Sequence, residues 1–213
     1  MSPGSAASPR APDFVVPGWL PGWKVARLRT IIAPPGIAFL GWWSPLTFGV
    51  GDLARCYKVA THVPPVPGCR CGFYAWHEPA AALRSLDGSA SVILDVELAG
   101  RVVVHEHGLV AARQRVRRVW VDAACHRDDA ACRPAVAVTA HPARPRVLVS
   151  ACPAHLPADG PAWDLVDLAA SFGVPVGWSD ACLPASARRD VAEADRPDPA
   201  TGGVDAPRNG EPR

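Results

Sequence analysis

The feature that most constrains this fold is a long stretch near the middle of the chain in which apolar and polar residues alternate. Residues 92–122 read VILDVELAGRVVVHEHGLVAARQRVRRVWVD. An apolar residue at every second position is typical of strands with one buried face. The short segment Glu106-His107-Gly108 divides the stretch and supplies a glycine where a tight turn commonly needs a positive φ. We therefore predict an antiparallel hairpin of residues 92–105 and 109–122, with four side chains largely buried: Val102, Val104, Val116 and Trp120.

The remaining chain predicts short elements, because 24 Pro and 18 Gly interrupt it at close intervals. Strands are expected at residues 25–32, 37–43 and 72–76, where apolar or alternating runs occur. Helices are expected only at residues 78–86 and 163–172. The fold class predicted is α+β, with a curved antiparallel sheet or partly closed β-barrel and two short helices.

The two ends of the chain differ in composition from its body. Residues 1–20 are rich in Pro, Ser, Ala and Gly and are predicted to form a flexible arm. Residues 184–213 contain almost nothing to bury and are predicted to be a disordered tail. A single α+β domain is expected over residues 21–183, since 213 residues suffice for one sizeable core.

Charge and hydropathy exclude several classes of protein. The formal net charge is only +2, with 20% charged residues, which argues against general disorder and against a polybasic nucleic-acid binder. The most apolar early stretch is broken by Pro34 and Pro35 and is too short to cross a bilayer. No secretion signal is recognisable in MSPGSAASPR, so a cytoplasmic location and no membrane partner are expected.

Cysteine and histidine residues predict a metal site in the first half of the chain. The chain has seven cysteines, an odd number that fits thiols in a reducing compartment better than a disulfide framework. Four of the candidate ligands follow the spacing C-x5-H-x6-C-x-C: Cys56, His62, Cys69 and Cys71. Thiolates with one imidazole are typical of closed tetrahedral zinc sites, so zinc is the expected cofactor. The alternative is that these are ordinary core and loop thiols.

A second set of candidate ligands lies further along the chain. It has the spacing C-x6-C-x19-C-x2-H and comprises Cys125, Cys132, Cys152 and His155, with His126 as a substitute for one member. The short C-x2-H spacing is common in zinc knuckles and ribbons. Two loop cysteines and one at a strand end would be the alternative.

Two segments resemble a family of small uncharacterised actinobacterial proteins. Residues 54–76 read ARCYKVATHVPPVPGCRCGFYAW and are similar to that family's C…H-x-x-P…C-x-C-G-x-Y-A motif. Residues 93–112 read ILDVELAGRVVVHEHGLVAA and are similar to its G-R-V-x-x-H-E-x-G hairpin. Ala99 stands where the family usually has Trp, Leu109 where it usually has an aromatic residue, and Val110 where it usually has Arg. The resemblance implies no particular activity.

Three arginines in the second arm of the hairpin suggest an anion-binding face. Arg113, Arg115 and Arg117 alternate and would project from one side of the strand, with Arg118 on the other. Guanidinium groups in a row bind phosphate by paired hydrogen bonds. The alternative is the solvent-exposed side of a half-buried strand.

These patterns lead to three hypotheses of function. The first is a non-enzymatic binding or adaptor module with a structural Cys/His loop and an unknown protein or nucleic-acid partner. The second is an enzyme of unknown reaction that uses a catalytic metal or a Cys71 nucleophile with His77 or His105 as base. The third is a weak nucleic-acid or phosphate binder that uses the arginine face. Common nucleotide, metalloprotease and serine-hydrolase motifs are absent from the sequence.

Overall fold

The computed structural model describes residues 13–32, 35–41, 46–58, 62–66, 69, 71–85, 91–127 and 132–179. The predicted tail, residues 184–213, and the first twelve residues of the predicted arm lie outside these described residues.

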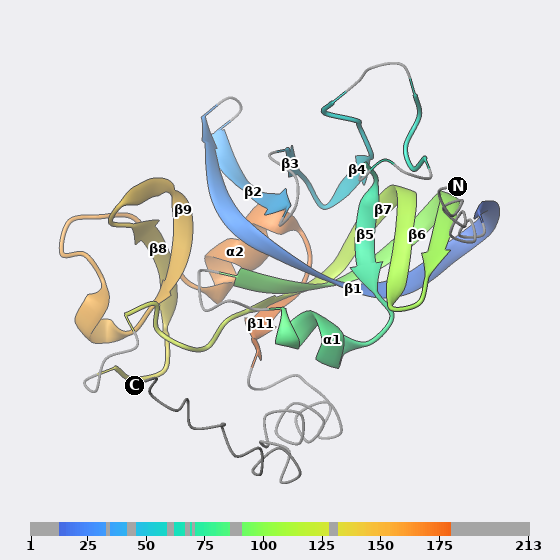
Figure 1. Ribbon diagram of the computed structural model, residues 1–213. Helices are drawn as coiled ribbons and strands as arrows, with labels where there is room; N and C mark the ends of the chain where they lie inside the picture. The colour runs from blue at the N-terminus through green and yellow to red at the C-terminus, as the bar shows by residue number, and fades with distance from the viewer. Residues whose placement is uncertain are drawn as a thin grey trace, which may run out of the picture.

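The central hairpin forms as the alternation predicts. Strands β6 (Ser91–His105) and β7 (Gly108–Val121) pair antiparallel and run side by side in Figure 1. Val102 and Val116 are buried, whereas Val104 and Trp120 are only half-buried. Gly108 does not have the positive φ expected of it. A Cβ at this position would lie 2.3 Å from the carbonyl oxygen of Ala75, so close approach of a neighbouring strand is what requires glycine here.

An irregularity in the hairpin changes which arginines share a face. Asp95 pairs with Arg118 and Val96 pairs with Val116, so Arg117 is an extra residue, a β-bulge. The bulge brings Arg118 onto the same outer face as Arg115, because their partners Asp95 and Glu97 are two residues apart. The expectation that Arg118 lies on the opposite face is therefore wrong.

Strand β1 (Asp13–Ile32) is the longest strand and joins several parts of the sheet. It pairs antiparallel with β6 from Asp13 to Arg27, with an irregularity between Val16 and Leu20. The predicted arm is thus paired with β6 from Asp13 onward, even though Pro17 interrupts its alternation. The end of β1 forms a second hairpin with β2 (Pro35–Gly41).

Pairing between strands closes part of the sheet into a ring. Strand β5 (Phe73–Trp76) pairs with β7 along its length and with β1 through Trp23 and Trp76. The pairs β1 with β6, β6 with β7, β7 with β5 and β5 with β1 therefore return to their starting point. Two short strands extend this region: β3 (Thr47–Phe48) pairs with β2, and β4 (Gly51–Leu53) pairs with β7.

A further hairpin lies at the other side of the molecule. Strands β8 (Ala137–His141) and β9 (Arg144–Ala151) pair antiparallel, and β9 meets β1 at Arg29 and Val147. Figure 1 shows this hairpin at the left, away from β5 and the β4–β5 connection. Strand β10 (Ala162–Trp163) continues it beside β8, and β11 (Val176–Trp178) pairs parallel with β7.

The described residues contain two α-helices, both close to their predicted positions. Helix α1 (Pro79–Arg84) has a proline in its first turn, where the missing N–H costs no hydrogen bond. Helix α2 (Leu165–Phe172) is capped at its start by Asp164, whose carboxylate accepts hydrogen bonds from the N–H groups of Val166 and Asp167. It is capped at its end by Gly173 in the left-handed conformation. A single 3₁₀ turn, η1 (Pro153–His155), follows β9.

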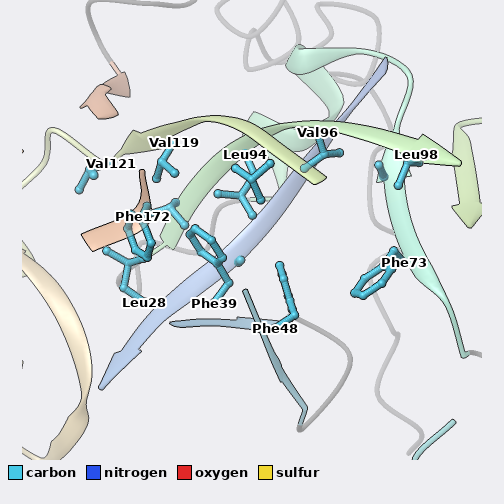
Figure 2. Packing of buried hydrophobic residues seen from close by; sticks show 14 of the residues in the cluster. Leu28, Phe39, Phe48, Phe73, Leu94, Val96, Leu98, Val119, Val121 and Phe172 are labelled. Carbon is cyan, nitrogen blue, oxygen red and sulfur yellow. The ribbon is translucent and has the colours of Figure 1, made fainter. Parts of the chain in front are cut away.

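The core lies between the curved sheet and α2. Figure 2 shows Phe39 and Phe172 packed together, and their ring centroids are 4.6 Å apart. Leu28, Leu94 and Val119 extend the same buried cluster. The mostly antiparallel, sheet-rich α+β class is confirmed, with a sheet that is ringed in part rather than a full barrel.

Candidate metal centres

The structure brings the first predicted set of ligands together in the connection between β4 and β5. We call Cys56, His62, Cys69 and Cys71 centre I; their four ligand atoms all lie within 4.8 Å of one another. The Sγ atoms of Cys56 and Cys69 are 3.8 Å apart, and His62 Nε2 lies 3.1 Å from Cys71 Sγ. Tetrahedral zinc with bonds of about 2.3 Å to sulfur would set two sulfurs about 3.8 Å apart. The Cys56–Cys69 distance agrees with this value.

Local backbone conformation holds Cys71 at the start of β5. Gly72 has a φ of +112°, a conformation that residues with a Cβ rarely adopt. A Cβ on Gly72 would lie 2.4 Å from Cγ1 of Val110 and 3.2 Å from Cβ of Pro65. The glycine that directly follows the last ligand is therefore a steric requirement of centre I.

Centre I is partly enclosed, and its chemistry favours a bound cation. Cys71 is buried, while Cys56, His62 and Cys69 are half-buried. Burial, together with the neighbouring Cys69, raises the pKa of the Cys71 thiol to about 11. A divalent cation would supply the missing positive charge and displace the thiol protons on binding.

The second set of ligands converges with more regular geometry. We call Cys125, Cys132, Cys152 and His155 centre II, and their ligand atoms also lie within 4.8 Å of one another. His155 Nδ1 is 3.4 Å from Cys125 Sγ, 3.5 Å from Cys132 Sγ and 3.4 Å from Cys152 Sγ. Around tetrahedral zinc, with bonds of about 2.3 Å to sulfur and about 2.0 Å to nitrogen, the expected separation is about 3.5 Å. One imidazole nitrogen is thus nearly equidistant from three sulfurs, as a Cys₃His centre requires.

Three segments of the chain supply the ligands of centre II. Cys125 follows β7 and Cys132 precedes β8. Cys152 directly precedes the η1 turn after β9, and His155 is the last residue of that turn. Backbone hydrogen bonds tie these segments to one another, including one from Ala135 N to the carbonyl of Ala123, 2.9 Å long.

The surroundings of Cys152 favour its negatively charged thiolate form. The backbone N–H of Arg133 makes the largest contribution in lowering the pKa of the Cys152 thiol to about 6, against an opposing effect of burial. The N–H of Ala154 acts in the same direction. Hydrogen bonds from backbone amides to a ligand sulfur stabilise the thiolate that a metal needs.

His126, which the sequence leaves as a substitute ligand, belongs to neither centre. Its Nδ1 donates to the carbonyl of Ser150 over 3.0 Å, and its backbone N–H donates to the same oxygen.

The residues of the predicted catalytic pair do not meet. Cys71 lies before β5 and His77 after it, so the strand separates them. His77 Nε2 instead donates to the carbonyl of His105 over 3.3 Å, and the imidazole beside Cys71 is that of His62. Among the described residues, Cys71 therefore has a partner within centre I and makes no hydrogen bond to His77 or His105.

The three arginines of the predicted face are exposed, with Arg117 in the bulge, and they are engaged within the chain. Arg115 and Arg117 both donate hydrogen bonds to the carboxylate of Glu97. The guanidinium groups of Arg113 and Arg115 lie 5.6 Å and 4.3 Å from the ring centroid of Trp19. Two of the three predicted arginines thus already have an anionic partner.

Comparison with protein-family models, curated proteins and solved structures finds no match for this chain. The resemblance to the actinobacterial family stays a prediction. Within the described part of the chain, no helix has the length and apolar character needed to span a membrane.

One feature of the structure has no counterpart in the predictions from sequence. Lys24 lies on the buried face of β1 and borders a cavity that lies next to centre I. The signal in the sequence is its position, since Gly22, Lys24, Ala26 and Leu28 alternate on the buried face of β1.

Proposed function

We propose that this protein is a non-enzymatic binding or adaptor module in which both Cys/His centres hold structural zinc ions. The observation that carries the proposal is the nearly equal spacing of His155 Nδ1 from three cysteine sulfurs, at 3.4, 3.5 and 3.4 Å. These separations fit one zinc ion bound by all four side chains.

The ligand sets favour zinc over other metals and a structural role over a catalytic one. Three thiolates and one imidazole match the preference of zinc, whereas calcium and magnesium prefer oxygen ligands. Each centre has four protein ligands, and a tetrahedral ion bound by four side chains has no open position for water or substrate. None of the four ligands of centre I lines the cavity beside it.

A structural role also fits the places that the centres occupy. Centre II joins the end of β7 to the start of β8 and the end of β9, beside the backbone hydrogen bonds that tie these segments together. The hairpin pairs with β1 through one residue pair, Arg29 with Val147. Centre I holds a connection rich in proline and glycine, which has little apolar surface of its own to bury. At centre I an ion would replace packing that the local sequence does not supply. At centre II it would link segments that already carry buried residues such as Val138 and Leu148.

The alternative functions have less support. An enzyme that uses Cys71 as nucleophile would need a base other than the His62 imidazole of its own ligand set. A phosphate or nucleic-acid binder would have to displace Glu97 from Arg115 and Arg117. The proposal assumes a reducing compartment such as the cytoplasm, where thiols remain available for zinc.

Removal of single ligands tests the proposal. Metal analysis of the purified chain is expected to give about two zinc ions, and C152S is expected to retain about one. The matched control is C182S, because Cys182 is in neither ligand set and its replacement should leave both ions bound. Chelation should lower the melting temperature of the wild type steeply. Protein that contains no metal as purified, and that melts at the same temperature with and without chelator, would contradict the proposal.

A further inference from the structure

Lys24 borders a cavity of about 140 Å³ between the middle of β1, the short strands β3 and β4, and the start of β5. Lys24 is only 7% exposed, so more than nine-tenths of its surface is removed from solvent. Other residues that line the cavity are Phe48, Asp52, Leu53, Arg55 and Phe73. The cavity thus combines a buried cation, two aromatic rings and a polar rim.

Within the described residues, the Lys24 ammonium has aromatic neighbours but no anionic one. Its Nζ atom lies 4.8 Å from the ring centroid of Phe48 and 4.9 Å from that of Phe73. Figure 2 shows these two rings as neighbours at one end of the buried cluster. Asp52, the acidic residue of the lining, accepts a 2.7 Å hydrogen bond from the N–H of Leu53 and makes no ion pair with Lys24 in the described structure. The buried charge therefore has only ring faces to stabilise it.

An unpaired ammonium in such a place is costly, and the cost points to a missing counter-ion. Burial lowers the pKa of Lys24 to about 7, well below the usual value for lysine. Cation–π contacts compensate only part of the lost hydration. A ligand that places a negative charge beside Nζ would recover more of it.

We propose that this cavity binds a small monocarboxylate, with its carboxylate at Lys24 Nζ and its apolar body against the rings of Phe48 and Phe73. A single buried cation matches a single negative charge, and Asp52 disfavours a second one in the same space. Arg55 lies exposed at the rim and adds a positive charge that attracts the ligand. The volume is close to that of an apolar cavity of about 150 Å³ that accommodates benzene.

The cavity is a different site from the two zinc centres, but it shares part of its wall with one of them. Arg55 and Gly72 line the cavity and directly precede or follow the ligands Cys56 and Cys71. The inference rests on the proposed function only in that centre I would fix this wall. Zinc content is therefore measured in every sample of the experiment below, so that loss of zinc and absence of a carboxylate site are separate results.

The experiment uses the fact that the chain contains only two lysines, Lys24 and the exposed Lys58. Full-length, zinc-loaded protein labelled with ¹³C at the lysine Cε atoms gives two signals, assigned with K24M and K58M. Addition of benzoate is expected to shift the Lys24 signal to saturation and to leave the Lys58 signal unchanged. Benzamide has the same shape without the charge and is expected to produce no saturable shift.

Calorimetry with the variants completes the test. K24M is expected to fold, because methionine suits a buried apolar site, and to bind benzoate at least about tenfold more weakly than wild type. K58M should bind it as wild type does. Zinc-replete protein whose Lys24 signal does not respond to benzoate, or responds equally to benzamide, would overturn the proposal. Unchanged benzoate affinity in K24M would do the same.

Discussion

Replacement of Gly72 by alanine perturbs centre I while it leaves all four ligands in place. The alanine would have to adopt a φ of +112°, which costs about 1–3 kcal/mol. Its Cβ would also lie 2.4 Å from Cγ1 of Val110, and forced overpacking of this kind costs about 1–3 kcal/mol. We expect G72A to lower the free energy of unfolding by about 2–6 kcal/mol.

The loss should be concentrated at centre I. A chain that relieves this strain must shift Gly72 and with it Cys71, so one of the two zinc ions should become labile while the other is retained. Urea denaturation followed by circular dichroism measures the change in stability. Zinc release to a chromogenic chelator measures the lability of each ion.

Two further variants keep the interpretation of G72A open to refutation. G49A is the matched control, because Gly49 is exposed, has no positive φ, and has no atom within 4 Å of the place where an alanine Cβ would lie. The stability of G49A should stay within about 0.5 kcal/mol of wild type. Adding V110A to G72A removes the closest contact and should recover part of the loss. If G72A unfolds at the same urea concentration as G49A and releases zinc at the wild-type rate, the steric argument is wrong.

Three other predictions concern charged residues. Burial raises the pKa of Glu97, but hydrogen bonds from Arg115 and Arg117 outweigh it and lower this pKa on balance. The stability that these hydrogen bonds contribute is therefore fully present above the usual carboxyl pKa and is lost as pH falls through the lowered pKa. E97Q should therefore cost at most about 1 kcal/mol at pH 7 and flatten the acid limb of a stability–pH curve from urea titrations. Replacing Arg113, Arg115 and Arg117 with Gln should leave retention on heparin unchanged, because Glu97 already occupies two of them; a loss of salt-sensitive retention would restore the anion-binding hypothesis. Lys24 has a pKa of about 7 in the folded protein, so between pH 7 and about 10 the unfolded chain binds more protons than the folded chain. The free energy of unfolding of the wild type should therefore rise with pH across that window, and K24M should lose this rise. Equal slopes of stability against pH in urea titrations of the two proteins would contradict the assigned burial of Lys24.

The hairpin shows how far residue patterning determines this fold. Alternation correctly places Val102 and Val116 in the core, since a period of two fixes the face of each strand residue. The bulge at Arg117 breaks that period. Two consecutive arginines between Val116 and Val119 mark the break in the sequence, and the prediction of a strict alternation through Arg117 overlooks it. Because of the bulge, Arg118 lies on the outer face, and Trp120 is half-buried against α1 and β1 rather than in the main core.

The two sets of candidate metal ligands were predictable from residue type, but their geometry was not. Cysteine and histidine are uncommon enough for their clustering to identify both ligand sets, whatever the folds of the loops that carry them. Cys125 and Cys152 are 27 positions apart, and the β8–β9 hairpin between them brings them together in centre II. The sequence analysis did not predict this hairpin. The Lys24 cavity was missed for a related reason: its walls come from β1, β3, β4 and β5, and no local pattern records that juxtaposition.

Metal analysis combined with zinc X-ray absorption spectroscopy on the purified full-length chain tests the central claim most directly. Two structural Cys₃His centres predict about two zinc ions per chain, in an average shell of three sulfurs at about 2.3 Å and one nitrogen at about 2.0–2.1 Å. Absence of zinc after purification without chelators, or a shell with an oxygen ligand in place of one sulfur, would contradict the account.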